Sequence, residues 1–106
     1  MPKIVTVFRA RLKPEGRADY FEMAPRMGEI AKAMPGYVSH KVFTADDGER
    51  VTIVEFDSAE AQDGWRFHPE HVAAKARGRA DFYSQYSIRI CEVLRSHDWT
   101  AKEPDG

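Results

Sequence analysis

The sequence predicts an α+β protein with the ferredoxin-like element order β-α-β-β-α-β. Four segments have the apolar alternation or the β-branched and aromatic content of strands, and two others have helical features. Proline, glycine and aspartate mark several of the boundaries between them. At 106 residues the chain suits one compact core rather than two. We therefore expect one domain over residues 1–95, followed by a polar tail over residues 96–106.

The first strand is predicted over residues 3–13, where side chains of alternating position fall on opposite faces. One face would carry Ile4 and Phe8, and the other Val5, Val7 and Arg9. Both faces of this strand are therefore partly apolar. An apolar face left in water would be larger than monomers usually expose, so a second copy of the chain is the simplest cover.

The first helix is predicted from Gly16 to Met34, because apolar residues recur there every three or four positions. Pro35 and Gly36 cannot continue it. Pro25 lies inside the pattern and removes a backbone donor, so we expect a kink or a break into two shorter helices. The apolar face consists of Tyr20, Met23, Ala24, Met27, Ile30, Ala31 and Met34.

A hairpin is predicted from strands over residues 37–44 and 50–56, joined by a loop whose Asp47-Gly48 step supplies the positive φ that hairpins need. The sequence Asp57-Ser58-Ala59-Glu60 then resembles a capping box, with Asp57 as the cap of a second helix. Ala61 and Trp65 would share the inner face of that helix. The last strand is predicted over residues 86–94.

The segment WRFHPEH, residues 65–71, places two histidines around a proline. Proline favours the first position of a helix, so Pro69 should begin a new helical segment with His68 as its cap. A metal pair of His68 and His71 is the weakest interpretation, since a zinc site needs three or four ligands and no HExxH or CxxC motif completes one. A purely structural corner and a pair of pocket residues both remain open. At a helix N-terminus His71 would favour its neutral form.

The charge balance excludes several partner classes. Sixteen Lys and Arg face seventeen Asp and Glu, so no basic surplus exists to bind nucleic acid or an anionic membrane. The short apolar run before Arg9 is unlike a signal or a spanning segment. One cysteine, Cys91, cannot form an internal disulfide, which agrees with a cytoplasmic protein. No phosphate-binding loop or dinucleotide motif is present, and we expect no cofactor.

A family resemblance extends over residues 3–95. The helix ending in MPGYVS and the following WRFHPEHVAAKARGRADFYSQY together resemble the antibiotic biosynthesis monooxygenase family. The most specific part of the resemblance consists of Trp65, His68-Pro69-Glu70-His71, Gly78-Arg79, Phe82-Tyr83 and Tyr86. The resemblance implies a dimeric α+β barrel, in which two ferredoxin-like sheets pack face to face.

The resemblance also implies an activity: oxidation of a small aromatic or quinol-type molecule by dioxygen without a bound cofactor. The candidate catalytic residues are then His71 or His68 as base and Tyr83 as a donor. Trp65 would form the pocket wall. The other candidate substrate-binding residues are Tyr86, Arg9 and Phe67.

Two alternatives accompany this hypothesis. The haem-degrading branch of the family pairs a first-strand asparagine with a tryptophan and a histidine ten places on; here Phe8 and Lys75 occupy the asparagine and histidine positions, so haem degradation is disfavoured. The phenol-oxidising branch also carries a strand asparagine, and this sequence contains no Asn. A non-enzymatic dimer that binds a small apolar molecule, or a purely structural member, is therefore the second hypothesis.

Overall fold

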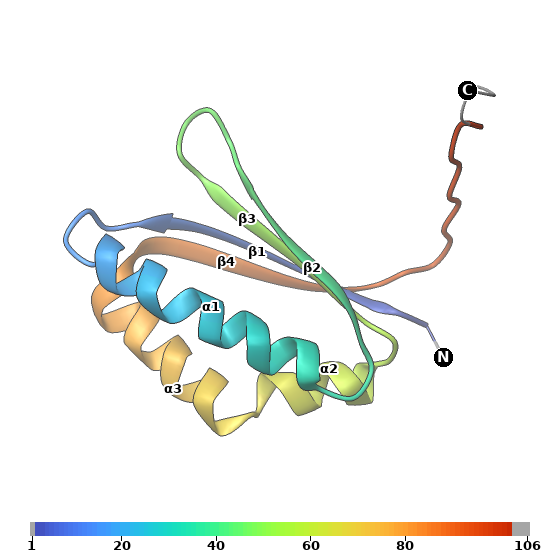
Figure 1. Cartoon of the computed structure of the whole chain (residues 1–106), viewed down its shortest axis with the longest axis horizontal. Helices are drawn as coiled ribbons and strands as arrows, with labels where there is room; N and C mark the ends of the chain where they lie inside the picture. Colours follow the sequence, from blue (N-terminus) through green and yellow to red (C-terminus); the bar gives the residue numbers. More distant parts are fainter. Residues whose placement is uncertain (1, 103–106) are drawn as a thin grey trace.

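The computed structural model describes residues 2–102 and has the ferredoxin-like fold that the sequence predicts. Figure 1 shows the helices gathered on one face of a single sheet, with the C-terminal segment extending away from the body. The elements are β1 (Ile4–Leu12), α1 (Arg17–Ala33), β2 (Tyr37–Thr44), β3 (Arg50–Phe56), α2 (Ala59–Arg66), α3 (Pro69–Arg77), the π-helical segment η1 (Gly78–Phe82) and β4 (Tyr83–Glu92).

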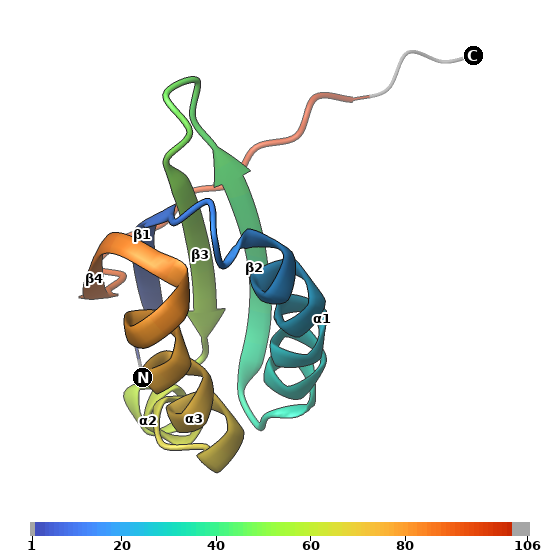
Figure 2. The same cartoon turned by 90° about the vertical axis from the view of Figure 1, so that its left-hand side faces the viewer.

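The sheet has the strand order β2-β3-β1-β4, and every neighbouring pair is antiparallel. Its register decides which side chains lie beneath the helices. Phe8 of β1 lies opposite Thr52 of β3 and Ile88 of β4, so these three share the helix-covered face. Val7 lies opposite Ile53 and Arg89 on the other face. Figure 2 shows α1 and α3 side by side in front of the sheet.

The helix α1 runs without interruption through Pro25. The expected break into two helices is therefore wrong. Proline removes one intrahelical hydrogen bond, but most of the stability of a helix in a protein comes from packing of its apolar face. Ile30 and Ala31, in the half of α1 that follows Pro25, are buried against Phe56 and Trp65, and partly buried Met27 packs against the same cluster.

The cap of α2 is Ser58 rather than Asp57, so the predicted capping residue is wrong by one position. The Ser58 hydroxyl accepts a hydrogen bond from the backbone N–H of Ala61 at 3.1 Å. The backbone N–H of Asp57 instead donates to the carbonyl of Gly36 at 2.8 Å. This bond ties the end of β3 to the turn before β2. Ser58, the next residue, is then the cap, and α2 begins at Ala59.

The bend at His68 is confirmed. Pro69 is the first residue of α3, and Nδ1 of His68 accepts from the backbone N–H of Glu70 at 3.2 Å. The last strand begins at Tyr83, three residues before the predicted start, and it ends at Glu92 rather than Leu94. The π-helical segment η1 leads directly into it. Pattern analysis missed this join because the last residue of η1, Phe82, is a buried core residue followed at once by the strand.

The core lies between α1, α2 and β3. Its buried members are Ile30, Ala31, Phe56 and Trp65, and the partly buried residues packed against them are Met27, Met34, Tyr37, Val54 and Ala61. Two of the helical methionines therefore belong to the core, as the sequence predicts. Met23, one turn earlier, lines a cavity, and Met27 also contributes to that wall.

The opposite face of the sheet carries no helix (Figure 1). Phe43 and Ile53 expose 47% and 37% of their surface there. The chain from residue 93 to residue 102 forms no helix or strand, and Leu94 and Trp99 are largely exposed along it. Residues 103–106 of the predicted tail lie outside the described part. Within residues 2–102, none of the helices has the length and apolar character needed to cross a bilayer.

Candidate functional site

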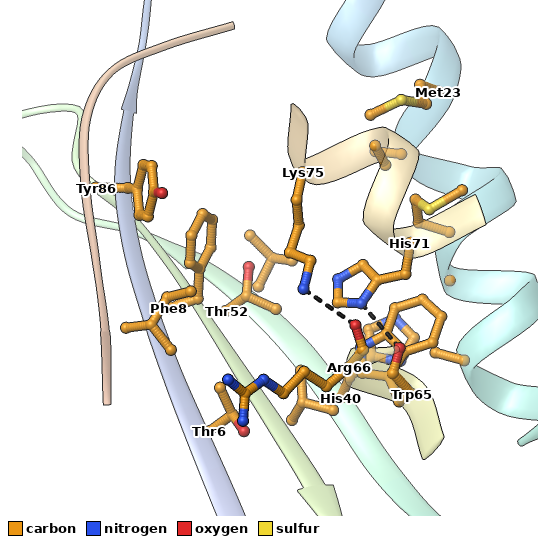
Figure 3. A pocket seen from close by; sticks show the side chains of 18 of the residues that line it. Thr6, Phe8, Met23, His40, Thr52, Trp65, Arg66, His71, Lys75 and Tyr86 are labelled. Atoms are coloured by element: carbon orange, nitrogen blue, oxygen red, sulfur yellow. Dashed lines mark hydrogen bonds between the residues drawn. The ribbon is translucent and has the colours of Figure 1, made fainter. Parts of the chain in front are cut away.

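A cavity of about 530 Å³ lies between the helices and the covered face of the sheet. This volume falls within the range of small-molecule sites, roughly 300–1,000 Å³. Figure 3 shows His71 and Lys75 extending from α3 into this space. Phe8, Thr52 and Tyr86 stand on the sheet across from them. The site is thus formed by α1 and α3 on one side and the sheet on the other, and α2 adds Gln62, Trp65 and Arg66.

Trp65 and His71 form the most ordered contact in the cavity wall. Their rings stack with centroids 3.9 Å apart and planes 13° apart. Nδ1 of His71 lies 3.0 Å from the carbonyl oxygen of Trp65. A carbonyl oxygen only accepts hydrogen bonds, so Nδ1 carries the proton and donates. In the neutral ring Nε2 then holds a free lone pair.

Burial keeps His71 neutral. Desolvation is the largest cause that lowers its pKa, to about 4, and the charges of Lys75 and His68 act in the same direction. The hydrogen bond to Trp65 opposes them. At neutral pH the His71 ring is therefore a hydrogen-bond acceptor through Nε2, held in one orientation by stacking on one side and by a backbone bond at Nδ1.

Aromatic rings form the wall at the sheet. Phe8 lies with its ring centroid 5.4 Å from that of Tyr83 and 5.6 Å from that of Tyr86. Burial raises the pKa of Tyr83, and the neighbouring Tyr20 adds to the effect. Tyr83 therefore keeps its proton and serves as a hydrogen-bond donor rather than a base. Tyr86 is 40% exposed and stands where the cavity meets solvent.

His40 of β2 also lines the cavity, and sequence analysis missed it. Its Nδ1 lies 2.7 Å from the hydroxyl of Tyr37. A Cβ added at Gly28 of α1 would lie 3.4 Å from its Nε2, about van der Waals contact, so the ring lies directly against the helix. The sequence did contain a signal for His40: alternation along β2 places it on the same face as Val42, and both line the cavity.

Three cationic side chains line the cavity: Arg66 from the end of α2, Lys75 from α3 and Arg79 from η1. Nζ of Lys75 donates to the carbonyl of Arg66 at 3.0 Å, which ties α3 back to the end of α2. Partial burial lowers the pKa of Lys75, and the charges of Arg66 and Arg79 lower it further. Nothing in the sequence pattern indicated that these three converge.

Three residues that the sequence singled out lie elsewhere. His68 caps α3 and does not line the cavity, which matches its purely structural interpretation. Phe67 is 64% exposed, with the guanidinium of Arg66 4.9 Å from its ring centroid. Arg9 points to the uncovered face of the sheet, where it donates two hydrogen bonds to Glu49 at 2.9 and 3.2 Å.

The remaining candidates, His71, Trp65, Tyr83 and Tyr86, all line the cavity. Their chemical roles stay predictions. Within residues 2–102, no three His, Cys, Asp or Glu side chains are grouped so as to hold a metal ion. The cavity instead offers one imidazole acceptor, phenolic donors, cations and aromatic surface.

The sequence matches a known protein family and a bacterial protein. Residues 3–77 match the family described as antibiotic biosynthesis monooxygenase. The chain is 35% identical over 94 residues to the uncharacterised protein YqjZ of Bacillus subtilis, a match that covers 89% of this chain and 82% of that protein.

Two solved structures illustrate the shared fold. Rv0793 from Mycobacterium tuberculosis has a TM-score of 0.80 at 18% identity, over 91% of this chain and 99% of its own. SnoaB from Streptomyces nogalater, described as a cofactor-independent oxygenase, has a TM-score of 0.74 at 16% identity, over 91% of this chain and 97% of its own. At these identities the likeness shows the fold alone.

Proposed function

Because the chain belongs to the antibiotic biosynthesis monooxygenase family, we propose that it is a cofactor-independent monooxygenase acting on a small aromatic or quinol-type molecule with dioxygen. One observation carries the proposal: a neutral imidazole, His71, is held in a fixed tautomer in the wall of an aromatic cavity. The description of the similarly folded SnoaB as a cofactor-independent oxygenase supports it.

In the proposed reaction, Nε2 of His71 accepts a proton from an acidic C–H or O–H of the bound substrate. The resulting anion gives one electron to dioxygen, and the substrate radical and superoxide combine to form a C–O bond. The peroxide takes the proton back from His71. Loss of the second hydrogen from that carbon and cleavage of the O–O bond yield a ketone and water, so a CH₂ group and O₂ become C=O and H₂O.

The other residues bind and exclude water. Trp65 fixes the plane of the His71 ring, and Phe8 supplies apolar surface for an aromatic substrate. Tyr83, which keeps its proton, is placed to donate to a substrate oxygen. A bound aromatic substrate would displace water from these walls, which favours electron transfer from the anion to dioxygen because less water is left to stabilise the anion.

Oxygen consumption tests the activity. With a panel of anthrones and hydroxynaphthoquinols, we expect the purified protein to consume oxygen above the buffer rate, unchanged by EDTA. One atom of ¹⁸O₂ should enter the product. Replacing His71 by Gln should lower kcat by about 10²-fold or more, the usual contribution of a general base. Uptake at the buffer rate with every member of the panel would contradict the proposal.

The low pKa of His71 also favours a second candidate function, because so weak a base removes a proton only from an acidic or stabilised substrate. The chain would then bind a small aromatic molecule without oxidising it. Ligand at about a hundredfold over its Kd should stabilise the fold by about 2.7 kcal/mol. A clear thermal shift with no oxygen uptake would favour this function over the monooxygenase.

We further propose that two copies associate through the uncovered face of the sheet. Its two central strands carry Val7, Val51 and Ile53, and charged side chains of both signs, among them the Arg9–Glu49 ion pair and Arg89, lie beside them. A surface with an apolar centre and both signs of charge around it is complementary to itself across a two-fold axis. This is the pairing that the dimeric α+β barrel requires.

A further inference from the structure

The cations that line the cavity have no counter-charge there. None of the described residues in its wall is Asp or Glu, whereas Arg66, Lys75 and Arg79 all belong to it. Partial burial is the largest cause of the lowered pKa of Lys75, and repulsion from the charges of Arg66 and Arg79 lowers it further. The cavity therefore presents positive charge without an acidic neighbour in its wall, and a bound anion would supply the missing counter-charge.

Other cations of the same helices differ from these three in having carboxylate partners. Within residues 2–102 no carboxylate lies within ion-pair distance of Arg66, Lys75 or Arg79. Arg77, two residues from Lys75, contacts Asp19 at 3.4 Å and Asp81 at 3.6 Å. Arg26 of α1 likewise contacts Glu70 of α3 at 3.2 Å. The helical layer thus carries acidic residues that pair with other cations, but none of the described residues that line the cavity is acidic.

All three side chains line the same cavity, although the guanidinium of Arg66 also lies 4.9 Å from the ring centroid of the exposed Phe67. Lys75 and Arg79 are four positions apart, one helical turn, so they project from the same side of α3 and η1. The hydrogen bond from Lys75 to the carbonyl of Arg66 brings the end of α2 to the same place. In Figure 3 the ammonium group of Lys75 lies beside the His71 ring and faces the sheet.

We propose that the substrate is an aromatic hydroxy compound that carries a carboxylate, with the carboxylate held by Arg66, Lys75 and Arg79. The ring would lie against Phe8 and Tyr86, and the hydroxyl would reach His71. This inference rests on the proposed function for its reacting group, but the anion site itself is independent of catalysis. Two guanidinium groups and one ammonium group suit a planar carboxylate, which accepts several charge-assisted hydrogen bonds.

The site also resolves the weakness of His71 as a base. A proton moves to an imidazole of low pKa only when the anion left behind is stabilised. Lys75 is the cation nearest His71 in Figure 3, and it is one of the charges that lower the His71 pKa. Burial is the largest cause of the low His71 pKa, and it disfavours a buried phenolate as well. The positive charge of Lys75 also lowers the His71 pKa but acts in the opposite direction on a phenolate, so in this proposal the cations promote ionisation of the substrate.

Equilibrium binding tests the proposal without turnover. The probes are 1-hydroxy-2-naphthoate and its methyl ester, which have the same ring and hydroxyl but differ in charge. By isothermal titration calorimetry on the full chain, we expect the carboxylate to bind at least about tenfold more tightly than the ester, the equivalent of one charge-assisted hydrogen bond. Equal affinities would overturn the proposal.

Matched variants locate the anion site. Lys75→Met and Arg79→Gln should each weaken binding of the carboxylate about tenfold and change binding of the ester less than about twofold. Lys32→Met removes the same charge from the exposed end of α1 and should change neither. Arg79 is exposed, so its variant is informative even where Lys75→Met fails to fold. Equal loss for both probes would overturn the assignment.

The outcomes separate this inference from the monooxygenase proposal. Equal binding of ester and carboxylate together with oxygen uptake on uncharged anthrones would refute the carboxylate site and leave the monooxygenase standing. Discrimination against the ester without oxygen uptake on any substrate, carboxylated ones included, would support the anion site and refute the monooxygenase. If neither probe binds, the inference fails, and the oxygen assay alone decides the activity.

Discussion

His71 owes its chemistry to two contacts that lie within six residues of the chain. The carbonyl of Trp65 fixes the proton on Nδ1, and the Trp65 ring covers one face of the imidazole. His68, three positions earlier, has instead turned Nδ1 to the backbone N–H of Glu70. The two histidines of one short segment thus differ in position: His68 caps the end of α3, whereas His71 lies on the side of α3 that faces the cavity.

The depressed pKa of His71 predicts a pH-dependent stability. Between pH 6.5 and about 4 the unfolded chain binds a proton at His71 that the folded chain does not. Stability should therefore fall as the pH is lowered through this window, and His71 should add no pH dependence above it. Urea unfolding at several pH values should show a shallower loss in His71→Gln than in the unmodified protein.

A control separates this effect from general acid denaturation. His97 is exposed in the segment after β4, and His97→Gln should keep the pH dependence of the unmodified protein. The same slope in His71→Gln and in the unmodified protein would show that His71 titrates normally in the fold.

At the scale of elements, the junctions position the site more than the regular segments do. The turn from α1 into β2 depends on Gly36, which has φ +80° and whose carbonyl accepts from the N–H of Asp57. The same residue lets α2 approach, because an added Cβ would collide with Cβ of Ala61. The position of α2, and with it Trp65, therefore depends on the absence of a side chain here.

Gly36→Ala should destabilise the protein by about 3 kcal/mol, since it combines strain at positive φ with a steric clash. Gly48 offers a matched control. It has φ +89° in the β2–β3 loop, and nothing lies within 4 Å of an added Cβ. Gly48→Ala should cost only the strain, about 1 kcal/mol. Equal losses in chemical denaturation would show that the packing of α2 against this turn contributes little.

At the scale of the whole molecule, one layer of helices leaves half of the sheet uncovered. Val7 lies at the centre of that face, between Ile53 and Arg89. If two copies pair there, the total buried surface should exceed ~1,000 Å², and a carboxylate at position 7 would be desolvated in the interface. Val7→Asp should then raise the dimer dissociation constant about a hundredfold or more without unfolding the monomer.

Sedimentation at micromolar concentration measures this. The unmodified protein should sediment as a dimer and Val7→Asp as a folded monomer. Val72→Asp makes the same change on α3, where Val72 is 46% exposed, and should leave the dimer intact. A monomeric mass for the unmodified protein would mean that another element, such as the segment that carries Leu94 and Trp99, covers this face.

Local chemistry allowed much of the fold to be predicted. The strands over residues 37–44 and 50–56 were predicted with their observed bounds, because the turn between them depends on Gly48 and its neighbours. The bend at Pro69 was also predicted from local chemistry, because proline favours the first position of a helix. Alternation in the first strand also placed Arg9 and Phe8 on opposite faces of the sheet, and side chains on opposite faces cannot line one cavity.

The composition of the site was decided by tertiary structure. His40 on β2, Lys75 on α3 and Arg66 at the end of α2 meet only because the strand order β2-β3-β1-β4 and the packing of α3 bring them together. A sequence pattern records which face of its own element a residue occupies, and that is a local property. Which faces oppose each other across a cavity depends on register and helix packing between residues far apart in the chain.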